Sequence, residues 1–167
     1  MTYLDIVNNI LKRLRERTVS TVNESSYSSL IAVLVNDAKE TVENAFQWSG
    51  LRTTLTATTT NGTFNYELNG SLNAVTVLDV INVTDNFFLK PKGSHEFNKL
   101  FLSNNVGTGS PYYYSFNGIS TDGDTKVDLY PIPDTEYTIR FNCVLRTADL
   151  VNDADTITIP TKPIELL

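Results

Sequence analysis

The chain has 167 residues and a mass of 18.6 kDa, which is room for one domain or for one domain with a substantial insertion. Its net charge of −6 argues against phosphate binding as the main task, because that needs clustered Lys and Arg. One Cys excludes an internal disulfide, and with only one His a zinc site of the usual Cys/His kind is not expected.

The polarity of the chain is largely uncharged. Thr and Asn supply 22 and 17 residues, whereas charged residues make up 19%. Abundant Thr with few Lys and Glu favours β-structure over a large helical bundle. The longest apolar run, residues 30–35, is too short to cross a membrane, and the first residues lack the pattern of a signal peptide. We therefore expect a soluble protein that is made in the cytoplasm and has no membrane partner.

The first 52 residues differ from the rest in charge and pattern. They carry six Lys or Arg and six Asp or Glu, and the remainder carries seven and thirteen, so the negative excess lies in the second part. We expect an α+β fold with three parts. They are a helical hairpin over residues 1–50, an antiparallel, sandwich-like β-rich domain over 51–159, and the start of a C-terminal helix or arm over 160–167.

Residues 2–17 form the first predicted helix, because apolar residues recur there at spacings of three and four. Thr2 followed by Asp5 suits a capped N-terminus. The second half is basic, where the helix dipole favours cations. Its basic residues are Lys12, Arg13, Arg15 and Arg17. They form either a solvated helix face or a contact with an acidic partner surface, DNA phosphates included.

Residues 26–49 form a second, longer predicted helix, for which Gly50 is the expected stop. Its apolar stripe consists of Tyr27, Leu30, Ile31, Leu34, Ala38, Val42, Ala45 and Phe46. At about 1.5 Å per residue this helix would be about 36 Å long, which is long for so small a domain. Two helices cannot enclose a core alone, so we expect neighbouring copies of the chain to cover part of the stripe.

From residue 52 the apolar period changes to two, as in β-strands. Residues 55–60 and 63–68 flank Asn61-Gly62, and this pattern predicts a β-hairpin because Asn-Gly readily adopts positive φ. Further strands are expected at residues 74–83, 112–116, 126–130, 137–145 and 157–159, with 112–116 paired to 126–130. A short helix is expected over 94–102, capped by Ser94, with Phe97, Leu100 and Phe101 facing inward.

No motif predicts catalysis, a metal or a cofactor. His95 has no Gly-x-Ser-x-Gly sequence to accompany it, and Cys143 alternates with apolar residues as a buried thiol does. Asp122-Gly-Asp124 lacks the later ligands of a calcium loop. Tyr112, Tyr113 and Tyr114 form the densest aromatic cluster, but in a strand at most two of them share a face. They suit either a core with an interface or a platform that stacks sugars or bases.

Several segments, in their order along the chain, resemble the head-to-tail adaptor proteins of short-tailed bacteriophages, also called tail tubular protein A. Residues 3–11 look like the first helix of that family, and residues 36–52 look like its second. Residues 129–141, which read LYPIPD and then YTIRF, resemble the strand–turn–strand of its β-domain. Residues 159–167 resemble the approach to its C-terminal helix, although the helix itself is missing.

The resemblance implies a structural virion protein, assembled in the host cytoplasm, that forms a ring of twelve copies at the head–tail junction. The ring would join the portal protein to the tail nozzle protein, and double-stranded DNA would pass through it during genome ejection without sequence-specific binding. We expect subunit or portal contacts at Lys12, Arg13, Arg15, Tyr27, Ile31, Leu34, Phe46, Trp48, Ile164 and Leu167. We expect tail-protein contacts at Tyr112, Tyr114, Asp122 and Asp124. The alternatives are a carbohydrate-binding β-module of a phage tail or fibre and, third, a small hydrolase.

Overall fold

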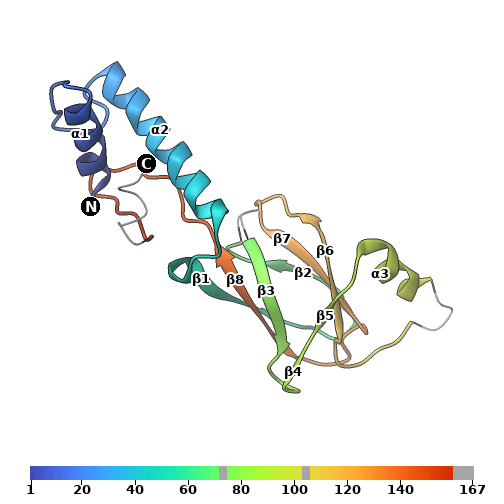
Figure 1. Cartoon of the computed structure of the whole chain (residues 1–167). Helices are drawn as coiled ribbons and strands as arrows, with labels where there is room; N and C mark the ends of the chain where they lie inside the picture. Colours follow the sequence, from blue (N-terminus) through green and yellow to red (C-terminus); the bar gives the residue numbers. More distant parts are fainter. Residues whose placement is uncertain (72–74, 103–105, 160–167) are drawn as a thin grey trace. The chain divides into compact units, whose positions relative to one another are not determined.

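The computed structural model describes residues 1–71, 75–102 and 106–159. Over these residues the chain has the expected α+β fold, with helices at the N-terminal end followed by two β-sheets (Figure 1). The chain divides into two compact units. One, here called the helical unit, consists of Met1–Leu51 and Arg146–Leu167; the other, the β unit, is Arg52–Leu145. The β unit is thus inserted into the helical unit, and it ends at residue 145, whereas the sequence placed its end at 159.

Helix α1 (Tyr3–Arg13) begins at the cap that the sequence predicts. The backbone N–H of Asp5 donates to Oγ1 of Thr2 over 3.2 Å, and the N–H of Thr2 donates to Asp5 Oδ2 over 3.0 Å. The helix ends four residues earlier than expected, because the chain turns at Arg15, which has a φ of 61°. A left-handed residue just after a helix is a common way to end it.

Helix α2 (Ser26–Ala45) is capped by Ser25 and ends before the short 3₁₀ helix η1 (Ser49–Leu51), so the prediction of helix up to residue 49 was too long. The predicted apolar stripe is not its most buried face. The buried residues of α2 are Ser28, Ile31, Ala32, Val35, Lys39 and Glu43. Small side chains and a paired Lys and Glu allow close packing there, and the rest of the stripe is turned away from the core.

The core of the helical unit lies between α1, α2 and residues 146–159. Its buried residues are Tyr3, Ile6, Val7, Leu11, Val22, Ile31, Ala32, Val35 and Leu150. Leu150 and Asn36 exchange two hydrogen bonds, of 3.0 and 3.1 Å, and the N–H of Tyr3 donates to the carbonyl oxygen of Asp155 over 2.8 Å. The expected strand at 157–159 was wrong. Thr156, just before it, forms one isolated bridge with Thr2, and the carbonyl oxygens of Asp153 and Asp155 accept from the N–H groups of Leu4 and Tyr3 at the start of α1.

The β unit contains two four-stranded sheets, in the orders β1-β8-β3-β4 and β2-β7-β6-β5. The strands of the first sheet are β1 (Arg52–Thr58), β8 (Thr138–Leu145), β3 (Val75–Asn82) and β4 (Phe87–Phe88). Those of the second are β2 (Asn65–Leu68), β7 (Thr125–Tyr130), β6 (Tyr113–Ile119) and β5 (Lys90–Pro91). All pairs are antiparallel except β5 with β6. The predicted pairing of residues 112–116 with 126–130 is confirmed as β6 with β7.

The predicted hairpin around Asn61-Gly62 was wrong, although the turn itself is present. Gly62 has a φ of 80°, as such a turn requires, but β1 pairs with β8 and β2 pairs with β7. The connection therefore crosses from one sheet to the other. The N–H of Gly62 donates over 2.8 Å to the carbonyl oxygen of Pro133, which lies between β7 and β8. A turn signal fixes the local backbone conformation but not the strand on which the chain then packs.

Both sheets contribute to one core in the β unit. Its buried residues are Ala57, Leu68, Val80, Leu89, Tyr114, Val127, Leu129, Tyr137, Ile139 and Phe141. The alternation predicted for residues 137–145 is confirmed, since Ile139, Phe141 and Cys143 are all buried. Helix α3 (Ser94–Phe101) buries Phe97 as expected, but its N-cap is Gly93 and not Ser94.

Candidate interaction surface

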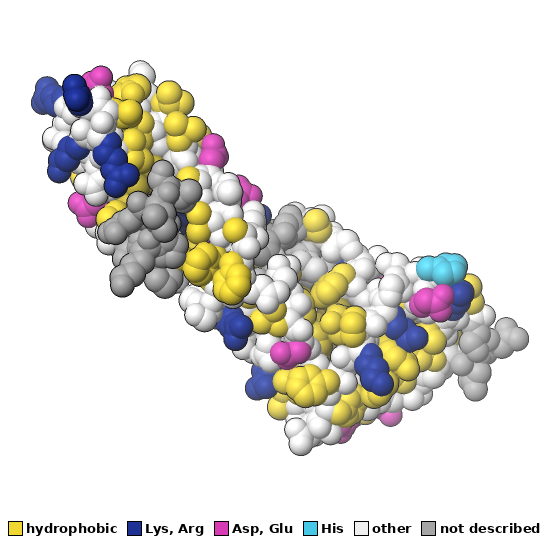
Figure 2. All heavy atoms as spheres, viewed as in Figure 1, with side chains coloured by type: hydrophobic (Ala, Val, Ile, Leu, Met, Phe, Trp, Pro, Cys, Tyr) yellow, Lys and Arg dark blue, Asp and Glu magenta, His cyan; other side chains and the backbone are white. Residues whose placement is uncertain are grey.

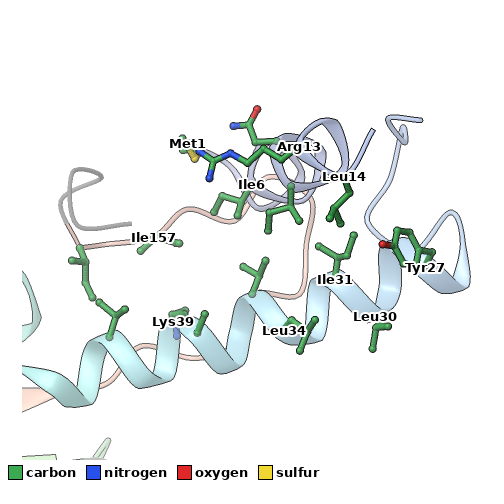
Figure 3. A pocket seen from close by; sticks show the side chains of 16 residues that line it. Met1, Ile6, Arg13, Leu14, Tyr27, Leu30, Ile31, Leu34, Lys39 and Ile157 are labelled. Carbon is green, nitrogen blue, oxygen red and sulfur yellow. The ribbon is translucent and has the colours of Figure 1, made fainter. Parts of the chain in front are cut away.

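A groove of about 480 Å³ opens in the helical unit between α1, α2 and the segment that ends at Ile159 (Figure 3). Its lining is apolar apart from Asn9, Arg13 and Lys39. The apolar lining residues are Met1, Ile6, Ile10, Leu14, Tyr27, Leu30, Ile31, Leu34, Val35, Ala38, Val42, Ile157 and Ile159. An apolar hollow of this size on one unit is typical of a surface that binds another apolar segment.

Helical spacing explains why the groove forms. Ile6, Ile10 and Leu14 follow one another at intervals of four along α1 and therefore share one face. On α2 the opposite wall consists of most of the apolar stripe predicted from the sequence. Figure 3 shows Ile6 and Leu14 on one side and Ile31 on the other, facing each other across the groove. The stripe is thus the wall of an open groove and not the centre of the core.

Part of the stripe lies at the protein surface. Tyr27, Leu30 and Leu34 are 45, 55 and 55% exposed, and Val33 beside them is 57% exposed. Hydrophobic side chains run along this part of the helical unit in Figure 2. Single exposed apolar residues are ordinary, but a row of four large ones on one helix indicates a contact with another molecule.

The predicted basic residues lie at the end of α1. Lys12, Arg13 and Arg15 are all exposed, and Arg13 also lines the groove. Figure 2 shows Lys and Arg side chains gathered over this part of the helical unit. Among the described residues none of the three forms an ion pair with a carboxylate. Their charge is therefore available to a partner.

The other predicted contacts of the helical unit lie at the opposite end of α2. Phe46 is 65% exposed, and its ring meets that of Trp48 edge-on with centroids 5.4 Å apart. The indole N–H of Trp48 donates to the carbonyl oxygen of Val42 over 2.8 Å, which fixes the ring against the helix end. Ile164 and Leu167 lie outside the described residues.

A buried ion pair that the sequence reading missed lies under the groove. Nζ of Lys39 is 3.4 Å from Oε1 of Glu43 and donates to the carbonyl oxygen of Thr147 over 2.9 Å. The hydroxyl of Thr147 donates to Glu43 Oε1 over 2.6 Å. In the sequence, the available signal was a Lys and a Glu four residues apart, on a face of α2 that the predicted apolar stripe does not include. The pair thus anchors the segment that follows β8, which contains Thr147, to helix α2.

The four residues predicted to contact a tail protein do not form one surface. Tyr114 is buried in the core of the β unit, whereas Tyr112 is 36% exposed. The ring of Tyr112 lies against that of Tyr113 at 84°, so the two do not form a flat platform. Asp122 is exposed in the β6–β7 turn. Asp124 is partly buried and accepts a hydrogen bond from the N–H of Gly70 over 3.0 Å.

The residues considered for chemistry are separate from one another in the structure. His95 is exposed on α3, and Cys143 is buried in β8, where burial raises the pKa of its thiol. Within residues 1–71, 75–102 and 106–159 no three His, Cys, Asp or Glu side chains are placed to hold a metal ion. In the same part of the chain, no helix has the length and apolar character needed to cross a membrane.

Comparison with known proteins identifies the family of the chain. No curated protein matches the chain. The family model described as SU10 adaptor protein matches residues 1–167, the whole chain. The chain therefore belongs to the SU10 adaptor protein family, which makes it a structural component of the phage virion with a role as a head–tail adaptor.

Proposed function

We propose that this protein is the subunit of a ring, of twelve copies, that joins the portal protein to the tail nozzle protein in a short-tailed phage. In this proposal it is a structural protein without catalytic activity or cofactor, related to the tail tubular protein A group. Double-stranded DNA passes through the ring during genome ejection, and the copies assemble in the host cytoplasm.

The observation that carries the proposal is the exposed apolar row on α2. Tyr27, Leu30, Val33 and Leu34 expose more apolar surface than a single copy covers. Head-to-tail contacts between identical subunits close into rings when the rotation per copy is right, and such contacts join two different surfaces of the subunit. In the ring, the exposed apolar row of one copy contacts a different surface of the next copy, so the row need not be complementary to itself. The basic end of α1 then suits an acidic surface of the portal.

The charge of the chain supports free passage of DNA. A net charge of −6 opposes the contacts that neutralise phosphates and hold proteins on a duplex. A channel wall with this negative charge lets DNA slide through the ring. The carbohydrate-binding alternative has less support, because Tyr114 is buried and Tyr112 and Tyr113 are not coplanar.

Two matched double variants test the proposal. Leu30→Glu with Leu34→Glu places two carboxylates in the exposed row, and Thr41→Glu with Asn44→Glu adds the same charge at exposed polar positions of the same helix. In native mass spectrometry with the portal protein, the natural chain and the second variant should give one discrete high-order complex. The first variant should stay monomeric with an unchanged circular dichroism spectrum. Assembly of the first variant at the natural level would overturn the proposal.

A further inference from the structure

We propose that Lys90 and Lys92 of one copy bind Asp134 and Glu136 of the next copy, so that the β units of neighbouring subunits are in contact. The inference rests on the proposed function, because it names a second contact of the ring beside the apolar row on α2. It depends only on surfaces of the β unit.

Two ammonium groups lie on tyrosine rings at one edge of the second sheet. Nζ of Lys90 is 5.1 Å from the centroid of the Tyr112 ring, and Nζ of Lys92 is 4.4 Å from that of Tyr113. The two ring centroids are 4.9 Å apart. A side-chain hydrogen bond with Tyr112 raises the pKa of Lys90. Because these contacts hold the ammonium groups in place, less side-chain freedom is lost when a partner binds them.

The charges of Lys90 and Lys92 are not neutralised within the described part of the subunit. The β unit has six Lys or Arg and nine Asp or Glu, and two of the six are already paired with carboxylates. Among the residues that the structure describes, no carboxylate forms an ion pair with either lysine. Figure 2 shows Lys or Arg side chains set among hydrophobic ones on the β unit. Two fixed cations of this kind on an acidic unit indicate a contact with a negatively charged partner surface.

The backbone at this edge is unsuited to an added strand. The N–H groups of Lys90 and Lys92 donate over 2.9 Å to the carbonyl oxygens of Tyr112 and Tyr114, so the nitrogen between them points away from the sheet. That nitrogen belongs to Pro91, which has no N–H to offer. A contact at β5 therefore depends on side chains. The two lysines, two residues apart in extended chain, have Cα atoms about 6.6 Å apart and project to the same side.

The same chain carries an acidic pair with the matching spacing. Asp134 and Glu136 are both exposed between β7 and β8, and they too are two residues apart. The hydroxyl of Tyr137 holds the carboxylate of Asp134, and Glu136 forms no ion pair with any described residue. Asp124 and Asp155 belong to the other two pairs with this spacing, but they accept hydrogen bonds from backbone N–H groups of their own subunit.

A second copy fits the two lysines better than a nucleic acid does. Two cations neutralise too few phosphates to hold a duplex on a unit with more carboxylates than basic residues. The rings of Tyr112 and Tyr113 lie at 84° to each other and each contacts an ammonium group, so they offer bases no stacking platform. The lysines and the carboxylates come from different segments of the subunit, as a head-to-tail contact requires.

Exchange of the charges tests the inference on full chains mixed with the portal protein. Lys90→Glu with Lys92→Glu places like charges across each proposed contact, and so does Asp134→Lys with Glu136→Lys. Each double variant alone should need roughly tenfold more protein than the natural chain for half-maximal assembly, measured by mass photometry. An equal mixture of the two should assemble at the natural concentration, because copies that alternate around the ring have opposite charges at every contact.

Two further variants serve as controls. Lys99→Glu with Arg140→Glu gives the first change in net charge at exposed positions elsewhere in the β unit and should assemble at the natural concentration. A chain with all four exchanges should assemble alone, which also shows that the new residues permit folding.

Three results would overturn the inference. They are normal assembly of either double variant, a mixture that assembles no better than its components, and retention of duplex DNA by the natural chain that Lys90→Glu with Lys92→Glu abolishes. Absence of a ring from the natural chain would instead overturn the proposed function, and the inference with it.

Discussion

The phenol of Tyr137 donates a hydrogen bond of 2.7 Å to Oδ1 of Asp134, three residues before it. This bond, together with burial and the negative charge of the carboxylate, raises the pKa of Tyr137 to about 12 from the usual 10.0. Because the folded chain holds the proton more tightly than the unfolded chain, the resulting stabilisation is complete below pH 10. It is lost as the pH rises from 10 toward 12.

An alkaline titration followed by tyrosinate absorbance tests this relationship. Tyr137→Phe should remove the latest ionisation step of the folded chain, and Tyr27→Phe should leave that step in place. The stability difference between Tyr137→Phe and the natural chain should shrink above pH 10. A late step of full amplitude in Tyr137→Phe would assign the high pKa to another tyrosine.

Two carboxylates make the helical unit sensitive to acid. The pKa of Asp5 is held below its usual 3.8 by the N–H and hydroxyl of Thr2, and that of Asp155 by the N–H groups of Asn152 and Val151. Lowered pKa values stabilise the fold above about pH 4, and this contribution is lost as the pH falls through the folded values. Between pH 5 and 2.5 the melting temperature of Asp155→Ala should therefore fall less than that of the natural chain. The difference between the two falls corresponds to the protonation of roughly one carboxylate. Equal falls would contradict the prediction.

Removal of one member of the buried pair in α2 should strongly destabilise the helical unit. Glu43→Ala leaves the ammonium of Lys39 buried without its carboxylate and frees the hydroxyl of Thr147. We expect a loss of about 3–5 kcal/mol in the free energy of unfolding, measured by urea titration. The control is Glu40→Ala, which breaks the exposed pair with Arg146 and should cost less than about 1 kcal/mol. A cost for Glu43→Ala as small as for Glu40→Ala would refute a structural role for the pair.

Substitutions in the core of the β unit should destabilise that unit separately from the helical unit. Phe141 is fully buried between the sheets, and Phe141→Ala should cost about 3–5 kcal/mol of stability. Phe88→Ala is the matched control, since Phe88 is 62% exposed and its loss should change stability by less than about 0.5 kcal/mol. The two units have separate cores, so hydrogen exchange should speed up in Phe141→Ala mainly at amides of residues 52–145. Uniform acceleration over the whole chain would argue against separate units.

Much of the fold could be predicted because local signals agreed with the final packing. The cap formed by Thr2 and Asp5, the alternation around Phe141 and the strand pair β6–β7 depend on neighbours in sequence or on one clear apolar face. The surplus of apolar helical surface also followed from length and spacing alone. These features need no knowledge of which distant segment packs where.

The predictions failed where burial or strand pairing depends on segments that are distant in the sequence. The buried face of α2 contains Lys39 and Glu43, which the predicted apolar stripe did not include, and their burial depends on Thr147, more than one hundred residues later. Likewise Asn61-Gly62 forms its turn, yet the partner of β1 is β8, from the far end of the β unit. The burial of Tyr114, on β6 of the second sheet, follows from the first sheet, where its ring meets that of Phe141 on β8. A single sequence does not encode such partners in its local pattern.

The insertion of the β unit has a structural consequence. Its first residue, Arg52, pairs with Val144, next to its last, so the chain leaves and re-enters the helical unit through adjacent strands with Cα atoms about 5 Å apart. A tight loop would bridge that gap. Replacement of the whole β unit by another module would therefore leave the two chain ends of the helical unit at the same spacing.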